Sequence, residues 1–166
     1  MKALTALILG AGLSGLVQSL QAAESLETDP VLQIIVSGST RTVTRLELEK
    51  EITPAELTVY SPVYQRPMTY QGFWLDQVLK AVHVRLSDQD VVFEASDGYG
   101  TSLAPEEVGK EKWLLAYGEP GGWTPLPERN NPTFPGPWYV VGRDTSSYQE
   151  FPWPYEVVAI KIRADW

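Results

Sequence analysis

The stretch Val91–Thr101, VVFEASDGYGT, places several chemically useful groups where a strand is expected to end. Apolar residues alternate along its first half, which predicts a strand. The Asp97-Gly98 pair then predicts a tight turn, because glycine tolerates a positive φ. This turn presents the Asp97 carboxylate, the Ser96 hydroxyl, the Gly98 backbone and the Tyr99 ring. Together they suit a flat ligand with a polar edge, and a plain hairpin in which Asp97 caps its own turn is the equal alternative.

Aromatic residues stand in two further segments, each beside an expected strand. The first is a long loop, residues 118–137, which is dense in Gly, Pro and Asn. Such a loop inside a compact domain is usually functional or disordered, and its aromatic residues argue against disorder. Rings stack on flat ligands with roughly 0.5–1.5 kcal/mol per pair beyond burial, although each ring could instead pack a loop-rich edge of the core. The residues are Trp123, Phe134 and Trp138 in or after this loop, and Phe151, Trp153 and Tyr155 before the last expected strand.

Composition excludes several classes of function. The chain has 166 residues, 43% of them hydrophobic, which predicts one domain with an ample core. Its net charge is −8 and it has no basic run, so nucleic acid is not an expected partner. Cysteine is absent, which excludes disulfides, thiolate catalysis and sulfur-ligated metal sites. The single histidine, His83, supports neither a histidine metal site nor a Ser–His catalytic pair.

The N-terminus has the pattern of a signal peptide. Lys2 supplies a positive start, Ala3–Val17 is apolar, and Ala22-Ala23 offers small residues for cleavage. The apolar run is shorter than the roughly 20 residues of a membrane span, so an uncleaved anchor is the lesser alternative. We therefore expect residues 1–23 to be removed and residues 24–166 to act in the bacterial periplasm, where disulfides are permitted but not required.

The remaining sequence predicts short strands with a few short helices, which is an α+β fold with a mixed or antiparallel sheet in a compact single domain. Strands are expected at 31–37, 56–60, 68–71, 90–96, 113–117, 138–142 and 156–163, and helices at 45–51, 74–82 and 104–108. Thr44 and Glu47 have the spacing of a capping box. Asp97 and Trp153 are expected outside the apolar core, which is expected to include Val78, Leu79, Val91, Phe93, Leu115 and Ile160.

Six motifs follow one another along the chain: GFWLDQVL, VVFEASDGY, a short PEE helix, LLAYGEPGGWTPLP, PGPWYVV and WPYEVVAIKI. In this order they resemble the molybdopterin-binding fold of the sulfite oxidase superfamily, over about Val31–Ile162. The resemblance implies a compact domain that cradles a pterin. The family's metal-ligating cysteine would fall near Tyr60-Ser61, where this chain has no cysteine. The resemblance therefore implies a pterin site to which the protein contributes no molybdenum ligand.

The segment before the last strand carries Trp153 and Tyr155, where the enzymes of the family often carry Ser and Lys for the cofactor phosphate. Aromatic residues there imply a free, neopterin-like pterin without phosphate or molybdenum. The chain is similar in this to short, cysteine-less periplasmic relatives, the PruR-type proteins. Those relatives bind free pterins and signal to a membrane-bound partner that controls cyclic di-GMP. The implied pterin-binding residues are Tyr60, Ser61, Ser96, Asp97, Gly98, Tyr99, Trp138, Trp153 and Tyr155.

The resemblance thus implies a periplasmic pterin-binding protein without catalysis of its own, which regulates a membrane-bound signalling partner. The pterin edge carries two adjacent N–H donors, which one carboxylate can accept in parallel. Asp97 is the first candidate for that carboxylate and Glu94 the second. Two alternatives stay open: an oxidoreductase that holds molybdenum through pterin sulfurs alone, and a protein–protein adaptor without a ligand.

Export is directly testable. If residues 1–23 are a cleaved signal peptide, the periplasmic fraction should contain a mature chain that starts at Ala23 or Glu24, give or take one residue. Intact-mass spectrometry of that fraction measures this. Full-length chain retained in the membrane fraction would contradict the expectation.

Overall fold

The computed structural model describes residues 29–127 and 132–164. The expected signal peptide, residues 1–23, lies outside the described residues. Within the described part of the chain, none of the helices has the length and apolar content that a membrane crossing requires.

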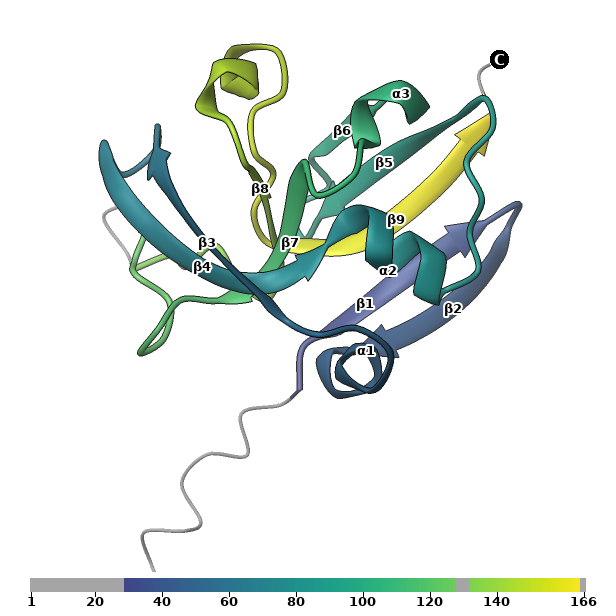
Figure 1. Ribbon diagram of the computed structural model, residues 1–166, viewed down its shortest axis with the longest axis horizontal. Coiled ribbons are helices and arrows are strands. Elements are labelled where there is room, and N and C mark those ends of the chain that lie inside the picture. Colours follow the sequence, from purple (N-terminus) through teal and green to yellow (C-terminus); the bar gives the residue numbers. More distant parts are fainter. Residues whose placement is uncertain (1–28, 128–131, 165–166) are drawn as a thin grey trace, which may run out of the picture.

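The fold is α+β, as the sequence predicts, with nine strands in two sheets and a few short helices among the described residues (Figure 1). Every strand pair is antiparallel except β1 with β9, which is parallel, so the first sheet is mixed. The first sheet has the order β2 (Ser39–Thr44), β1 (Val31–Val36), β9 (Val157–Ala164), β5 (Gln89–Ala95) and β6 (Gly100–Leu103). The second has the order β3 (Ala55–Ser61), β4 (Arg66–Trp74), β7 (Trp113–Gly118) and β8 (Tyr139–Gly142).

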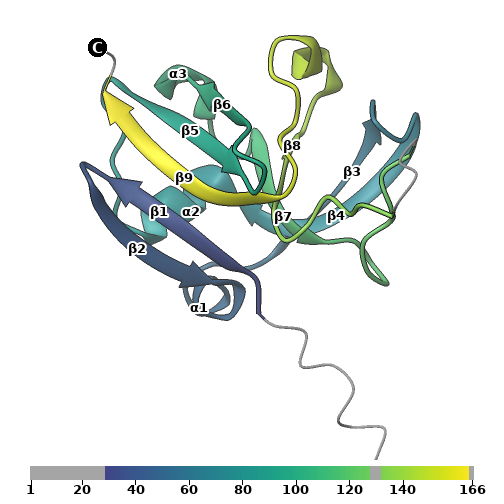
Figure 2. The same ribbon diagram turned by 180° about the vertical axis from the view of Figure 1, so that it is seen from behind.

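The two sheets meet near the start of β9 and open apart from there, with the β3–β4 pair on one side and β5 and β9 on the other (Figures 1 and 2). The helices are α1 (Arg45–Glu51), α2 (Leu75–Ala81), α3 (Pro105–Val108) and the 3-10 helix η1 (Thr145–Gln149). η1 lies near both β3 and β8, which are the two outer strands of the second sheet.

The predicted capping box starts α1. The Glu47 N–H donates to Thr44 Oγ1 at 3.2 Å, and the Thr44 N–H donates to Glu47 Oε2 at 2.9 Å. Two of the donors that a helix start leaves without partners are thereby satisfied. Lys50 in the last turn adds a favourable charge near the carbonyl end. This local chemistry fixes where α1 begins, and so places Arg45 at its first position.

Two strands, β2 and β6, are absent from the sequence prediction. β2 is STRTVT, and only Val43 in it is buried, so no apolar alternation marks it. β6 has four residues, of which only Leu103 is buried. Both are the outer strands of the first sheet. An outer strand is stabilised largely by hydrogen bonds to its neighbour, and those leave little trace in side-chain hydrophobicity.

All six residues predicted for the core are buried, which confirms that prediction. Trp153 is also buried, with 3% of its surface exposed, so the prediction that it lies outside the core is wrong. The segment FPWPY points Phe151 and Trp153 inward and leaves Pro152 exposed. Phe151 packs edge-on against Phe93 at 5.9 Å and Trp113 at 4.8 Å between ring centroids. These rings therefore join the two sheets, and Trp138, also fully buried, donates its indole N–H to the Val31 carbonyl at 3.1 Å.

A close backbone approach between β4 and β7 occurs at Gly72. The register of this pair shifts between Gln71 and Gly72, where the sheet has a bulge. A Cβ atom at Gly72 would lie 2.7 Å from the Ala116 Cα and would overlap the Leu115 carbonyl. Both are backbone atoms, which cannot move aside as a flexible side chain can. Position 72 therefore has no room for a side chain, and only glycine fits there without a shift of the backbone.

We predict that Gly72→Ala lowers the free energy of unfolding by roughly 3 kcal/mol or more, because the added methyl group overpacks a rigid contact. Gly118 is the matched control, since it pairs with Gln71 in the same two strands and a Cβ there would meet no atom within 4 Å. Urea unfolding of both variants measures the difference. Equal stability of Gly72→Ala and Gly118→Ala would contradict the prediction.

Candidate functional site

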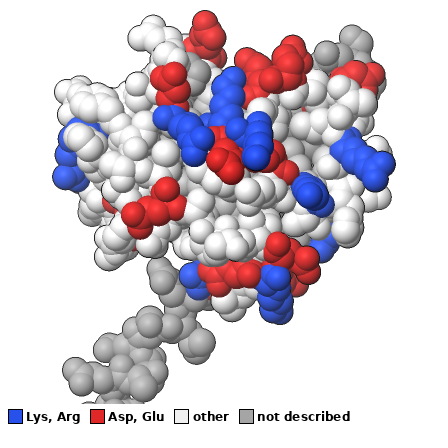
Figure 3. All heavy atoms as spheres, viewed as in Figure 1, with Lys and Arg blue, Asp and Glu red and all other residues white. Residues whose placement is uncertain are grey.

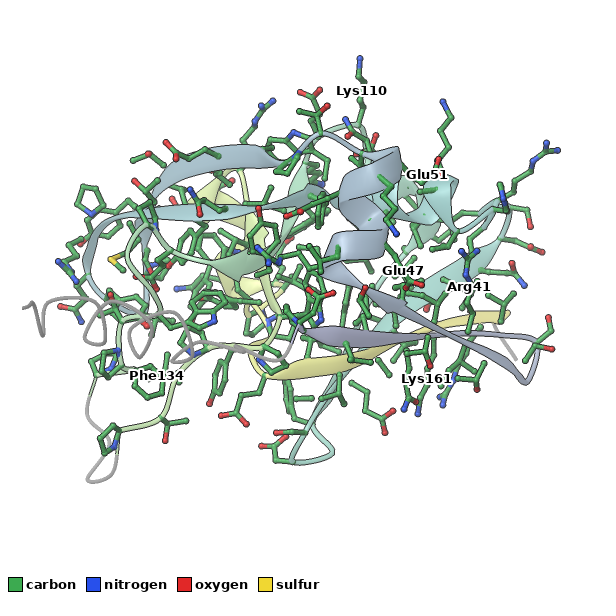
Figure 4. The ribbon with its side chains drawn as sticks, turned by 90° about the horizontal axis from the view of Figure 1, so that it is seen from below. Arg41, Glu47, Glu51, Lys110, Phe134 and Lys161 are labelled. Atoms are coloured by element: carbon green, nitrogen blue, oxygen red, sulfur yellow. The ribbon has the colours of Figure 1, made fainter. Side chains whose placement is uncertain are left out.

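A cleft of about 520 Å³ opens between the start of α1 and the long loop after β7. Figure 4 shows Phe134 on this loop, at the opposite end of the molecule from Arg41 and Lys161. The cleft is lined by Pro30, Arg45, Gln71, Tyr117, Gly118, Glu119, Gly122, Trp123, Phe134, Gly136 and Pro137. The lining therefore combines three aromatic rings, one cation and one carboxylate.

The aromatic wall of the cleft is held in place by packing. The Arg45 guanidinium lies over the Tyr117 ring, 5.3 Å from its centroid. Arg45 also pairs with Asp29 at 3.4 Å and Glu49 at 3.6 Å, so its charge is balanced locally. Trp123 packs so closely on Gly136 that a Cβ there would overlap the indole. These contacts give the cleft fixed, flat surfaces, and a flat ligand can stack on such surfaces.

The Glu119 carboxylate is the most unusual group of the cleft. Glu119 is only 8% exposed, and its Oε2 accepts a hydrogen bond from Thr124 Oγ1 at 2.6 Å. Its Oε1 is buried and has no hydrogen-bond partner among the residues that the structure describes. A buried polar atom without a partner costs roughly 1–3 kcal/mol, and more when the group is charged. Oε1 is therefore a buried acceptor whose hydrogen-bonding capacity is unused among the described residues.

Three phenols lie close enough to Glu119 for its charge to affect them, of which Tyr70 and Tyr139 are buried and Tyr64 is partly buried. The rings of Tyr70 and Tyr139 pack edge-on at 5.5 Å, and neither hydroxyl has a hydrogen-bond partner within residues 29–127 and 132–164. Burial raises the pKa of Tyr70 to about 12, with a further increase from the Glu119 charge and an opposing effect of the Ser61 hydroxyl, which does not reach hydrogen-bond geometry. Burial likewise raises the pKa of Tyr139 and of Tyr64, and Glu119 adds to both shifts. The phenols thus stay neutral near Glu119.

The residues of the β5–β6 turn form a separate group. Asp97 is exposed, and its Oδ1 accepts a hydrogen bond from the Tyr99 N–H at 2.9 Å, which is the arrangement of the plain hairpin. Gly98 has the positive φ, 84°, that the turn requires. Ser96 donates its backbone N–H to the Glu156 carbonyl at 2.9 Å and its hydroxyl to Glu156 Oε2 at 2.6 Å. The turn is thereby tied to the segment that precedes β9.

That tie brings several tyrosines together. Tyr99 is 49% exposed, and Tyr99 and Tyr155 both raise the pKa of Tyr148 after the larger effect of burial.

Two of the other predicted residues, Tyr60 and Ser61, end β3. Tyr60 is 53% exposed, whereas Ser61 is fully buried and accepts a hydrogen bond from the Tyr64 N–H at 3.4 Å.

The nine predicted residues thus fall into three groups: the β5–β6 turn with Tyr155, the end of β3, and two buried tryptophans. None of them lines the cleft. Sequence reasoning missed Glu119, Tyr117 and Arg45 as site residues. One signal could have found Glu119, since it is an acidic residue that follows the fully apolar strand WLLAY after a single glycine.

Other features of the described residues compete less well as a site. A wider groove of about 1470 Å³ runs beside α2, but no unpartnered buried side-chain atom lines it. On the face drawn in Figure 3, Lys and Arg lie among Asp and Glu, so that face has no large patch of a single charge sign. Across residues 29–127 and 132–164, no group of three or more His, Asp or Glu side chains could hold a metal ion.

Comparison of the sequence with models of known protein families and with curated proteins finds no match.

The raised pKa of Tyr70 predicts alkaline destabilisation. The tyrosine hydroxyl has an ordinary pKa of 10.0 in the unfolded chain, whereas burial raises the pKa of Tyr70 to about 12 in the folded protein. The contribution of the Tyr70 hydroxyl to the free energy of unfolding is therefore fully present below pH 10. It falls by roughly 1–3 kcal/mol as the pH rises from 10 to 12. Urea unfolding at steps from pH 9 to 12 measures the fall. Tyr70→Phe should show a shallower fall, and a slope equal to that of the wild type would contradict the assignment.

Proposed function

We propose that this protein binds a flat heterocycle of the pterin class in the cleft beside Glu119, without catalysis of its own. One observation carries the proposal: a carboxylate that is 8% exposed, with one unpartnered oxygen, lies among the aromatic rings of a cleft of about 520 Å³. Clefts of this size, mostly apolar with a few placed polar groups, are typical of small-molecule sites.

Pterin chemistry fits this lining. The aminopyrimidinone edge of a pterin offers two adjacent N–H donors, which suit the two oxygens of one carboxylate. In the described part of the chain Oε1 has no partner, and Oε2 keeps a lone pair beyond the one that Thr124 uses. Burial makes this pairing selective, because a ligand without both donors leaves a polar atom unsatisfied. The Tyr117, Trp123 and Phe134 rings supply surfaces on which the bicycle can stack.

Two carboxylates compete for the role of acceptor. Asp97 is exposed and already accepts a hydrogen bond within its own turn. Glu119 is buried and retains an unused oxygen. A hydrogen bond contributes more to selectivity where water cannot replace the ligand, which favours Glu119.

The residues do not fit a molybdenum centre of the sulfite oxidase kind. The chain contains no cysteine to supply a thiolate, and the ligand position implied by the resemblance falls near Tyr60, which is exposed, and Ser61, which is buried. A hydroxyl is a much poorer ligand than a thiolate for a metal centre that uses sulfur ligands. We therefore derive no redox step, and the oxidoreductase alternative gains no support from the described residues.

The proposal extends to location and partner. The N-terminal pattern of Lys2, Ala3–Val17 and Ala22-Ala23 supports a periplasmic protein, and the resemblance to PruR-type proteins supports control of a membrane-bound signalling partner. For such control, the ligand must bind the partner-competent state more tightly than the other state.

Glu119→Gln tests the site. This change keeps the size of the side chain but turns one acceptor oxygen into a donor, which would face the donors of the ligand. The affinity for neopterin should fall about 30-fold to 1000-fold, equivalent to roughly 2–4 kcal/mol. Quenching of neopterin fluorescence on titration with protein measures the dissociation constant.

Asp97→Asn is the matched control, because it makes the same chemical change at an exposed carboxylate outside the cleft. The affinity of this variant for neopterin should lie within about twofold of the wild-type affinity, since a solvated carboxylate adds little to selectivity. Loss of binding in Asp97→Asn but not in Glu119→Gln would move the site to the β5–β6 turn. A wild-type protein that binds no pterin would refute the proposed function.

A further inference from the structure

Two hydrogen bonds connect Glu119 to a turn far away in the sequence. The Tyr64 hydroxyl donates to the Thr124 carbonyl at 2.7 Å. The Thr124 hydroxyl then donates to Glu119 Oε2 at 2.6 Å. Tyr64 lies in the turn between β3 and β4, and its own N–H donates to the buried Ser61 hydroxyl at 3.4 Å. The β3–β4 turn, the long loop and the carboxylate of the cleft are thus joined in one chain of contacts.

These hydrogen bonds constrain the Glu119 carboxylate, whose orientation the backbone alone does not fix. Glu119 is followed by Pro120 and two glycines, both with positive φ, 88° and 101°. The Gly122 N–H donates to the Glu119 carbonyl at 3.0 Å, which closes a turn but leaves the carboxylate itself unconstrained. A carboxylate rotates readily about its last bond. The bond from Thr124 is the only hydrogen bond found for this carboxylate among the described residues, and it fixes one oxygen.

We propose that Thr124 and Tyr64 are positioning residues that fix the plane of the Glu119 carboxylate, so that the cleft selects ligands with two adjacent N–H donors over ligands with one. This inference rests on the proposed function and adds the source of its specificity. A carboxylate with a fixed plane presents both oxygens along one line, which matches two parallel donors. A carboxylate that can turn accepts a single donor equally well.

The experiment compares two ligands of nearly the same size. Pterin presents an amino group beside a ring N–H, whereas lumazine presents a ring N–H between two carbonyls. Isothermal titration calorimetry with each ligand gives a selectivity ratio for the wild type, Thr124→Val and Tyr64→Phe. Valine keeps the shape of threonine without its hydroxyl, and phenylalanine keeps the ring of tyrosine. Thr124→Ser restores the hydroxyl and tests rescue.

Thr69→Val is the matched control. Thr69 shares a hydrogen bond of 2.8 Å with Thr58 across the same β3–β4 pair, and neither residue lines the cleft. The variant therefore removes one threonine hydroxyl bond from the same part of the fold without touching Glu119. Its selectivity ratio should equal that of the wild type.

Thr124→Val should lower the affinity for pterin about 3-fold to 10-fold, the range for one lost hydrogen bond, and leave lumazine binding within about twofold. Tyr64→Phe should have a smaller effect in the same direction, and Thr124→Ser should recover the wild-type ratio. Equal losses for both ligands in Thr124→Val would overturn the inference, because they would show that Thr124 only stabilises the loop. Unchanged pterin affinity would overturn it as well. If the wild type binds neither ligand, the proposed function fails, and this inference fails with it.

Discussion

The first sheet depends on its last strand. β9 lies at the centre of the strand order, parallel to β1 with Ile34 opposite Ile160, and antiparallel to β5 with Phe93 opposite the same Ile160. Among the described strands, the β1–β2 and β5–β6 hairpins are joined within the sheet only through β9. Parallel pairing needs a long connection between the two strands. Nearly the whole described chain forms that connection, and the second sheet is built within it.

The aromatic residues explain how the second sheet is fixed to the first. Phe151 packs between Phe93 of β5 and Trp113 of β7, and Trp138 donates a hydrogen bond to the backbone of Val31, the first residue of β1. Tyr117 packs on Phe73 at 5.3 Å and on Trp138 at 6.3 Å. The same ring forms part of the cleft wall. One wall of the cleft therefore rests directly on the core, and this gives its otherwise irregular loop a rigid base.

The sequence predicts those parts of the fold that local chemistry and periodicity determine. The capping box of α1, the apolar face of α2 and the buried alternation of β5 each follow from neighbouring residues. Edge strands β2 and β6 do not, because their pairing depends on distant partners. Aromatic character alone could not tell that Trp153 points inward. Glu119 gains its importance from Thr124 and from phenols on β4 and β8, and residues that meet only in space leave no spacing pattern to find. Asp97, by contrast, has the local signature of a turn, and the structure shows it capping that turn.

The unpartnered oxygen of Glu119 also bears on how long each molecule survives in the cell. If the cleft binds a ligand as proposed, the buried acceptor lowers the stability of the ligand-free protein, and a ligand that satisfies it stabilises only the folded state. Proteases act on the small unfolded population, so a difference of 1–2 kcal/mol can change the steady-state amount of a protein several-fold. Empty molecules would then be cleared faster than occupied ones. The amount of protein present would itself follow the supply of ligand, before any partner is engaged.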